Sequence, residues 1–276
     1  MKRACVVGWP VEHSRSPLIH GYWLAKYGID GSYGKVAVPP DQAGTFLRSL
    51  PAQGLVGCNV TLPHKEIAFA VADEKRPAAA AVGAANTLWL EGGRLVADNT
   101  DGYGFIHNLR ATIPGVDVAG AVVVVLGAGG AARAVVHALL AHGVAEVRIV
   151  NRTQPRAETL AQHFGSKVKA YAWQERTMCA SGAGLLVNTT TLGMSGAPPL
   201  DLDVAALNPG SIVADIVYVP LVTPLLAAAR ARNLATVDGL GMLLHQAVPG
   251  FEKWFGVRPE VTQELRALLE RDIAGR

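Results

Sequence analysis

Apolar and polar runs divide the first hundred residues into short strands and helical stretches. Apolar strands are predicted at 4–8, 35–38, 55–60, 86–90 and 94–97, and helices are predicted to begin at Ser16-Pro17, Pro40-Asp41 and Pro63. The last two strands are joined by Glu91-Gly92-Gly93, which is typical of a hairpin turn. The pattern predicts an α/β layer with its own sheet.

Beyond residue 101 the pattern is a regular repetition of strand and helix. A helix is predicted over 101–111, and the segment 114–120 has the composition of a link between domains. Strands are predicted at 122–126, 147–150, 168–171, 184–188, 211–215 and 235–237. Helical crossovers between such strands predict a doubly wound parallel sheet. Two helices at 242–255 and 259–273 follow without a strand between them, so we expect them to pack back on the first domain.

A glycine-rich turn follows the β-branched strand at 122–126 directly. Gly127, Gly129 and Ala132 occupy the three positions of G-x-G-x-x-G/A. In that motif the first glycine makes a tight turn, the second lets a pyrophosphate approach the backbone, and the small third residue lets helix and strand pack closely. The helix N-terminus then offers free N–H groups to the phosphates. Between this strand and this helix, the motif predicts a dinucleotide site.

The end of the next strand indicates which dinucleotide binds. NAD enzymes carry an acidic residue there that holds the ribose 2′-hydroxyl. This chain has Asn151-Arg152-Thr153, with Arg156 close behind. A carboxylate would repel a 2′-phosphate, whereas the two arginines can pair with it and stack on adenine. The predicted cofactor is therefore NADP.

Composition excludes several classes of function. The chain has 276 residues, half of them hydrophobic and 17% charged, which is typical of a globular protein with ample core. A net charge of +3 is too small to indicate nucleic acid or an anionic membrane as a partner. No run is apolar enough for a signal peptide or a spanning helix. Three widely spaced cysteines suit a reduced compartment, so we expect a cytoplasmic protein. We also expect small molecules as its partners and a monomer or homodimer as its assembly.

Four polar clusters of the first domain fall where strands end and helices begin, the position at which open α/β sheets bind ligands. Each has an ordinary structural explanation, because Ser16 suits a helix N-cap before proline and Asn and Asp are common in turns. For Lys65 the ordinary explanation is a solvated surface lysine, which position alone does not exclude. The dipole of the predicted helix nevertheless opposes a cation in its first turn, and a proton-transferring lysine can use that placement. The clusters are Ser14–Pro17, Asn59–Lys65, Gly83–Thr87 and Asn99–Gly102.

Together these blocks resemble the shikimate dehydrogenase family. They stand in the family's order and span nearly the whole chain. The matching blocks are Ser14-x-Ser16-Pro17-x-x-His20, Asn59-Val60-Thr61-x-Pro63-x-Lys65, Gly83-Ala84-x-Asn86-Thr87, Asn99-Thr100-Asp101, Gly127-Ala128-Gly129-Gly130-Ala131, Asn151-Arg152-Thr153 and Asp238-Gly239-x-Gly241-Met242-x-x-x-Gln246-Ala247.

The resemblance implies reversible NADPH-dependent reduction of 3-dehydroshikimate to shikimate, in aromatic amino-acid biosynthesis. By motif position Lys65 would be the acid/base at the carbonyl oxygen, with Asp101 as its partner. Ser14 and Ser16 would hold the substrate carboxylate, with a further contact from Tyr218. The ring hydroxyls would be held by Thr61, Asn86, Asp101 and Gln246.

The resemblance also implies the residues that hold the cofactor. Ile216, Gly239 and Met242 would flank the nicotinamide. The substrate domain would comprise 1–101 and 240–276 and the NADP-binding Rossmann domain 102–239, with a cleft between them. The remaining cofactor contacts would come from Gly127, Ala128, Gly129, Gly130, Ala131, Asn151, Arg152, Thr153, Arg156, Asn188 and Thr189.

Two positions depart from the family pattern, and two other functions stay open. Pro77 stands near a common acidic position, which Asp73-Glu74 could supply, and Ala85 replaces a larger apolar residue. One alternative is a shikimate/quinate dehydrogenase of broader substrate and cofactor use. The other is a non-catalytic NADP-binding sensor, which would have no need of Lys65 and Asp101. The histidines have no metal-binding spacing, so no metal is expected.

Overall fold

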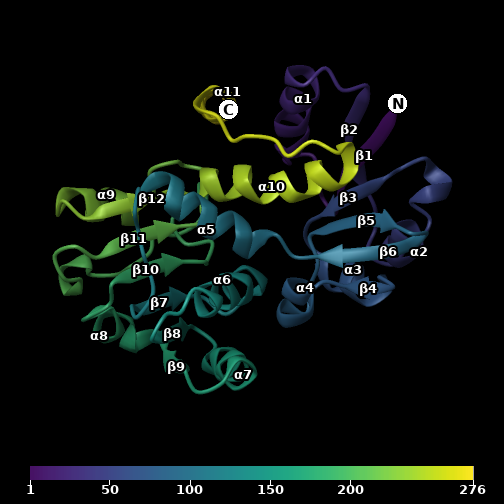
Figure 1. The fold of residues 1–276 in the computed structure, drawn as a ribbon. Coiled ribbons are helices and arrows are strands. Elements are labelled where there is room, and N and C mark those ends of the chain that lie inside the picture. The colour runs from purple at the N-terminus through teal and green to yellow at the C-terminus, as the bar shows by residue number, and fades with distance from the viewer. Residues whose placement is uncertain (276) are drawn as a thin grey trace. The chain divides into compact units, whose positions relative to one another are not determined.

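The computed structural model describes residues 1–275, and the chain divides into two compact units. Unit 1 is formed by residues 1–101 and the segment from Leu244 onward, and unit 2 by residues 102–243. The division near the C-terminus falls inside one helix, α10 (Gly239–Phe255), a few residues after the boundary at residue 240 that the resemblance implies. Figure 1 traces the chain from the purple N-terminus to the yellow C-terminal helices.

Unit 1 contains a six-stranded mixed sheet in the order β2-β1-β3-β5-β6-β4. β1 runs parallel to β2 and β3, whereas β5 is antiparallel to β3 and β6. The loop between β5 and β6 is the predicted hairpin, in which Gly92 and Gly93 have φ of 58° and 79°, a conformation that favours glycine. The strands are β1 (Lys2–Gly8), β2 (Gly31–Ala37), β3 (Gly57–Val60), β4 (Glu74–Lys75), β5 (Thr87–Glu91) and β6 (Arg94–Asp98).

Three helices of unit 1 begin later than their prolines suggest. A hydrogen-bonded turn precedes α2, in which Gln42 N donates to Pro39 O at 3.0 Å. Another turn precedes α3, in which His64 N donates to Thr61 O at 3.0 Å. The last helix begins after Thr262, whose hydroxyl caps Leu265 N. The helices are α1 (Ser16–Lys26), α2 (Ala43–Arg48), the 3₁₀ turn η1 (Pro51–Gln53), α3 (Lys65–Val71), α4 (Pro77–Val82), most of α10, and α11 (Gln263–Ala274).

The C-terminal helices pack on the N-terminal part of unit 1. Arg15 Nε lies 2.9 Å from Asp272 Oδ2, which ties α11 to the start of α1 (Figure 1). Trp254 of α10 donates its indole N–H to the Leu88 carbonyl of β5 at 2.9 Å. The C-terminal helices therefore belong to the same unit as the N-terminal sheet.

Unit 2 contains the predicted doubly wound sheet. Its six strands are all parallel, in the order β12-β11-β10-β7-β8-β9. Alternate residues of β7 enter two different hydrophobic clusters, so the strand is buried on both faces. The strands are β7 (Val122–Leu126), β8 (Glu146–Asn151), β9 (Val168–Ala172), β10 (Leu185–Asn188), β11 (Ile212–Asp215) and β12 (Ala235–Val237).

Helices connect these strands. The main crossover helices are α6 between β7 and β8, α7 between β8 and β9, and α9 between β11 and β12. Among residues 1–275 no helix has both the length and the apolarity that crossing a membrane requires. The elements are α5 (Asp101–Thr112), α6 (Gly130–Ala141), α7 (Gln154–Phe164), η2 (Trp173–Glu175), α8 (Arg176–Ala180), η3 (Val204–Ala206) and α9 (Pro224–Ala231).

All three cysteines are free, buried thiols. Cys5 of β1 and Cys58 of β3 are opposite each other in the strand register, and Cys179 lies in α8. Burial raises the pKa of Cys5 to about 12 and that of Cys179 to about 11. These thiols are therefore protonated and unreactive in the folded protein.

Candidate functional site

Lys65 and Asp101 form a close ion pair in unit 1. Lys65 is the first residue of α3 and Asp101 the first of α5, and Lys65 Nζ donates to Asp101 Oδ2 at 2.6 Å. The Lys65 and Asp101 side chains are 26% and 10% exposed, so water screens the pair only in part. The sequence-predicted proton-transfer residues thus lie in direct contact.

Asn86 connects this pair to the C-terminal segment of the chain. Its Nδ2 donates to Asp101 Oδ1 at 2.8 Å and to Gln246 Oε1 at 2.9 Å. Its Oδ1 accepts the backbone N–H of Thr100 at 2.8 Å, and the Thr100 hydroxyl donates to the Gln246 carbonyl at 2.8 Å. Residues far apart in sequence are therefore joined in one polar network around the Asp101 carboxylate.

A second layer supports this network from the sheet. Asn59 of β3 donates to the Asn86 carbonyl at 3.1 Å and accepts the Tyr33 hydroxyl at 2.7 Å. Burial raises the pKa of Tyr33, and hydrogen bonds with Ser16 and Asn59 oppose the rise. Asn59 is the first residue of the motif that contains Lys65, but the resemblance assigns it no role. Tyr33, in the middle of β2, carries no sequence signal because only tertiary packing brings it to Asn59.

The serine pair differs in one respect from the sequence prediction. Ser16 is the first residue of α1 and not its N-cap, a position that Arg15 occupies. The prediction of a Ser16 N-cap is therefore wrong, because the helix starts one residue earlier. Ser14 Oγ accepts the Ser16 backbone N–H at 3.3 Å. Ser16 is buried and Ser14 half-buried, at the loop that follows β1.

Thr61 follows β3 directly and packs beside Gly8 of β1. A Cβ at Gly8 would lie 2.4 Å from the Thr61 methyl, so a larger residue there would displace this side chain. The Thr61 hydroxyl has no hydrogen-bond partner among residues 1–275. It is available to a ligand.

The two departures from the family pattern have structural explanations. Asp73 accepts the Leu95 backbone N–H at 2.8 Å, and Glu74 pairs with Arg76 at 2.7 Å, so both carboxylates serve the β4 edge of the sheet. Pro77 begins α4. Ala85 is fully buried in the core of unit 1.

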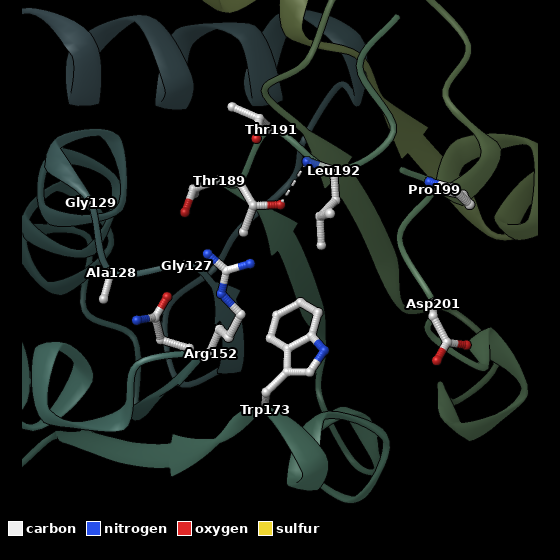
Figure 2. Close-up of a pocket in the computed structure, with 12 residues that line it drawn as sticks. Gly127, Ala128, Gly129, Arg152, Trp173, Thr189, Thr191, Leu192, Pro199 and Asp201 are labelled. Atoms are coloured by element: carbon white, nitrogen blue, oxygen red, sulfur yellow. Dashed lines mark hydrogen bonds between the residues drawn. The ribbon is translucent and has the colours of Figure 1, made fainter. Parts of the chain in front are cut away.

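Unit 2 contains a cavity of about 490 Å³ at the carboxyl ends of its central strands (Figure 2). The wall comes from the segments that follow β10, β7, β8 and β9, which are neighbours in that order. Six of the predicted cofactor residues line this cavity: Gly127, Ala128, Gly129, Asn151, Arg152 and Thr189. The others do not: Gly130, Ala131, Thr153, Arg156, Asn188, Ile216, Gly239 and Met242. The cavity is lined by Gly127, Ala128, Gly129, Asn151, Arg152, Trp173, Thr189, Thr190, Thr191, Leu192, Pro199 and Asp201.

The glycine turn leaves room for a ligand. Gly127 has φ of 107°, and a Cβ there would lie 2.7 Å from Thr189 Oγ1, so glycine is required. At Gly129 and Gly130 a Cβ would meet no protein atom within 4 Å. α6 starts after Gly129 with no side-chain cap and no acidic residue in its first turn. Its N–H groups fit a pyrophosphate.

The arginines after β8 fit a 2′-phosphate. Figure 2 shows the Arg152 guanidinium directed into the cavity. Arg152 and Arg156 are exposed, and within the described chain neither side chain forms an ion pair or hydrogen bond. Asn151 Nδ2 donates to the Thr153 carbonyl at 2.8 Å and so shapes this turn. The positive charges are free for an anionic group.

Asn188 shapes the cavity wall without lining it. The fully buried side chain donates to the Leu192 carbonyl at 3.1 Å and accepts the Thr190 hydroxyl at 2.7 Å. It also donates to Asp215 at 3.0 Å. Burial raises the pKa of Asp215 to about 6, against hydrogen bonds from Val217 N, the Thr223 hydroxyl and Asn188.

The residues expected around the nicotinamide lie together in unit 2. A Cβ at Gly239 would lie 2.2 Å from the Ile216 carbonyl, so the start of α10 touches the segment after β11. The Met242 side chain is 9% exposed and belongs to the hydrophobic core, on which Ile216 also packs. Tyr218 is half-buried in the same segment as Ile216. Within residues 1–275 no cluster of three or more His, Cys, Asp or Glu residues is arranged to hold a metal ion.

Three family models match the chain. Residues 6–88 match the shikimate dehydrogenase substrate binding domain, residues 110–193 match shikimate / quinate 5-dehydrogenase, and residues 239–269 match the shikimate 5′-dehydrogenase C-terminal domain. Shikimate dehydrogenase (NADP(+)) of Brucella canis is 57% identical over 99% of this chain and 95% of its own length. The protein of the same name from Azorhizobium caulinodans is 54% identical over 100% and 98%.

Solved structures agree with these sequence matches. Shikimate 5-dehydrogenase from Thermus thermophilus, in complex with NADP(H) and shikimate, is 36% identical with a TM-score of 0.86, over 100% of this chain and 99% of that one. Quinate dehydrogenase from Corynebacterium glutamicum, in complex with NAD, is 29% identical with a TM-score of 0.89, over 97% and 98%. The matches span both units, and the chain belongs to the shikimate dehydrogenase family.

Proposed function

We propose that this chain catalyses the reversible NADP-dependent reduction of 3-dehydroshikimate to shikimate, in aromatic amino-acid biosynthesis. The observation that carries the proposal is the contact of 2.6 Å between Lys65 and Asp101, with Asn86 and Gln246 held beside it. These four residues occupy the family's motif positions. A sensor that only bound NADP would gain nothing from this network.

Lys65 and Asp101 move the proton. As charge develops on the substrate carbonyl oxygen, the Lys65 ammonium donates to it, and Asp101 holds the ammonium in place. In the reverse direction the pair accepts the proton of the hydroxyl. Groups this close titrate together, so the proton belongs to the pair. NADPH, when bound, supplies the hydride.

Side chains of unit 1 orient the substrate ring. Ser14 and Ser16 follow β1 and would bind the carboxylate. Thr61 has an uncommitted hydroxyl for a ring oxygen. Asn86, Asp101 and Gln246 would exchange part of their mutual hydrogen bonding for the ring hydroxyls, at little cost because they are already in place. We assign Tyr218 a further carboxylate contact.

Residues of unit 2 hold the cofactor. The backbone of Gly127–Ala131 and the start of α6 would bind the pyrophosphate. Arg152 and Arg156 would pair with the 2′-phosphate, which is why the proposal specifies NADP. Thr189 lines the cavity, whereas Asn188 would act by positioning its loop. Ile216, Gly239 and Met242 would flank the nicotinamide.

The setting of the enzyme is also part of the proposal. Three free, buried thiols support a reducing compartment, and we propose the cytoplasm. We propose small molecules as its partners and a monomer or homodimer as its assembly, which light scattering of the purified protein would distinguish from larger oligomers.

The test is a set of four assays that follow nicotinamide absorbance with shikimate or quinate, each with NADP or NAD. Activity confined to shikimate with NADP supports the proposal. Comparable activity with quinate or NAD identifies the broader dehydrogenase, a substrate range that the serine pair would permit. Silence in all four assays, with NADP still bound in calorimetry, would identify a sensor.

A further inference from the structure

Trp173 occupies a position in the cavity that no predicted role explains. It directly follows β9 and lines the cavity at the outermost of the four strand ends. Figure 2 shows the Trp173 indole and the Arg152 guanidinium both rising into the cavity, with the Leu192 side chain pointing toward the indole. A partly exposed aromatic ring in a cavity wall can stack on a planar ligand that binds in the cavity.

Arg176 holds the Trp173 indole in place. Arg176 Cζ lies 5.4 Å from the centre of the Trp173 ring, and Arg176 Nη1 donates to the Trp173 carbonyl at 3.0 Å. Arg176 Nη2 in turn pairs with Asp201 Oδ2 at 2.6 Å. The ring is therefore preorganised, and the charge of Asp201 at the cavity edge is balanced by an arginine.

The order of the strands indicates what Trp173 meets. The proposed pyrophosphate site is at the end of β7, and Arg152, whose side chain has no partner in the described chain, follows β8, the next strand. Adenine is bonded to the ribose that carries the 2′-phosphate, and a base that continued in the same direction would reach the end of β9, the strand next to β8. That position is occupied by Trp173.

We propose that Trp173 is a stacking wall of the adenine subsite, with Arg152 beside it and Arg176 as the residue that positions the indole. A purine face stacks well on an aromatic ring, and such stacking tolerates small shifts of the ligand. The inference rests on the proposed function, because it takes the ligand of the cavity to be NADP.

Fluorescence tests the proposal directly, because Trp173 is the single tryptophan of residues 102–243. The probe is adenosine 2′,5′-bisphosphate, the adenine half of NADP, added to the full chain. We expect it to quench the tryptophan emission of the wild type. Trp173→Phe, which keeps a ring, should lose the quenching and bind the probe within about threefold of wild type by calorimetry. The matched control Trp89→Phe, in β5 of unit 1, should keep the quenching.

Affinity provides the second measurement. Trp173→Ala should raise the Kd of adenosine 2′,5′-bisphosphate about tenfold. It should leave the Kd of nicotinamide mononucleotide, which lacks adenine, unchanged. Unchanged bisphosphate affinity in Trp173→Ala, or quenching that persists in Trp173→Phe, would overturn the proposal.

The outcome separates this inference from the proposed function. A wild type that oxidises shikimate with NADP, beside a Trp173→Ala variant of normal bisphosphate affinity, contradicts only the adenine subsite. A wild type that is inactive with shikimate, but whose Trp173 emission the bisphosphate quenches, supports the subsite and contradicts the proposed reaction.

Discussion

The candidate sites of the two units are built in opposite ways. In unit 1 the candidate side chains are hydrogen-bonded to one another: Lys65 to Asp101, and Asn86 to both Asp101 and Gln246. In unit 2 the candidate site consists of space at Gly129 and Gly130 and of arginines without partners in the described chain.

The difference fits the proposed role of each site. A proton-transfer pair must be in position before the substrate arrives, so its geometry is held by the protein. A pyrophosphate is bound by backbone N–H groups, which any side chain would obstruct, and a 2′-phosphate needs a charge that the protein has not neutralised. Substitutions in unit 1 should therefore change the rate, and substitutions in unit 2 should change affinity.

The largest effect should come from Lys65→Ala. Loss of the proton donor is expected to lower kcat for shikimate oxidation about 10³-fold, with a much smaller change in KM. Steady-state kinetics at saturating NADP measures both. Lys26→Ala, at the exposed end of α1, is the matched control and should behave as wild type. An active Lys65→Ala enzyme would contradict the proposed role.

Asp215 is an exception within unit 2, because its buried carboxyl is fully hydrogen-bonded. Its folded pKa of about 6 lies above the usual 3.8, so the folded state holds this proton more tightly than the unfolded state. The contribution to stability is complete below the unfolded pKa and is lost as the pH rises through about 6. The loss amounts to about 3 kcal/mol.

Asp215→Asn should remove this pH dependence, because the amide stays neutral. Urea unfolding at pH 4.5 and pH 7 measures it, and the free energy of unfolding of the variant should fall less between the two pH values than that of wild type. Asp117→Asn, which replaces an exposed carboxylate of unit 2, is the control. Parallel pH profiles for wild type and Asp215→Asn would rule out the raised pKa.

Arg152→Ala tests whether the positive charge of Arg152 makes the cavity select NADP over NAD. It should raise the KM for NADP about tenfold more than the KM for NAD, because only NADP has the 2′-phosphate. Kinetics with each cofactor at saturating shikimate measures the ratio. Equal increases for the two cofactors would mean that the 2′-phosphate binds elsewhere.

Gly129→Ala tests whether the space beside the Gly129 backbone is needed for NADP to bind. The added methyl group meets no protein atom, so the free energy of unfolding should change by less than about 1 kcal/mol. The affinity for NADP should nevertheless fall about tenfold, because the methyl group occupies the path of the pyrophosphate. Calorimetry measures the Kd, and Gly21→Ala, at an equally open position in α1, should leave it unchanged. Wild-type affinity in Gly129→Ala would refute the pyrophosphate assignment.

Local signals made the cofactor unit predictable. The β-branched strand, Gly127 and the arginines after β8 are adjacent in sequence, so the chain displays the motif directly, and all six predicted strands of unit 2 are found. β4 has only two residues and pairs with β6, too little for a periodic pattern. Helices α2 and α3 begin a few residues later than predicted, because each is preceded by a hydrogen-bonded turn that proline alone does not specify.

The candidate site was predictable only where a motif carried it. The motifs named Lys65, Asn86, Asp101 and Gln246, but their mutual hydrogen bonds depend on the tertiary fold. Tyr33 and Trp173 lay outside every motif, since each owes its position to neighbouring strands. The roles of all these residues stay predictions.

The buried thiols make it possible to measure how often each unit transiently opens, without adding a probe to the protein. A thiol reagent needs both access and a thiolate, and the folded chain denies both at Cys5, Cys58 and Cys179. Labelling therefore proceeds only through molecules that have transiently opened. Since Cys5 and Cys58 lie in unit 1 and Cys179 in unit 2, mass spectrometry of the labelled peptides would time the opening of each unit separately, and would show which one a bound nucleotide slows.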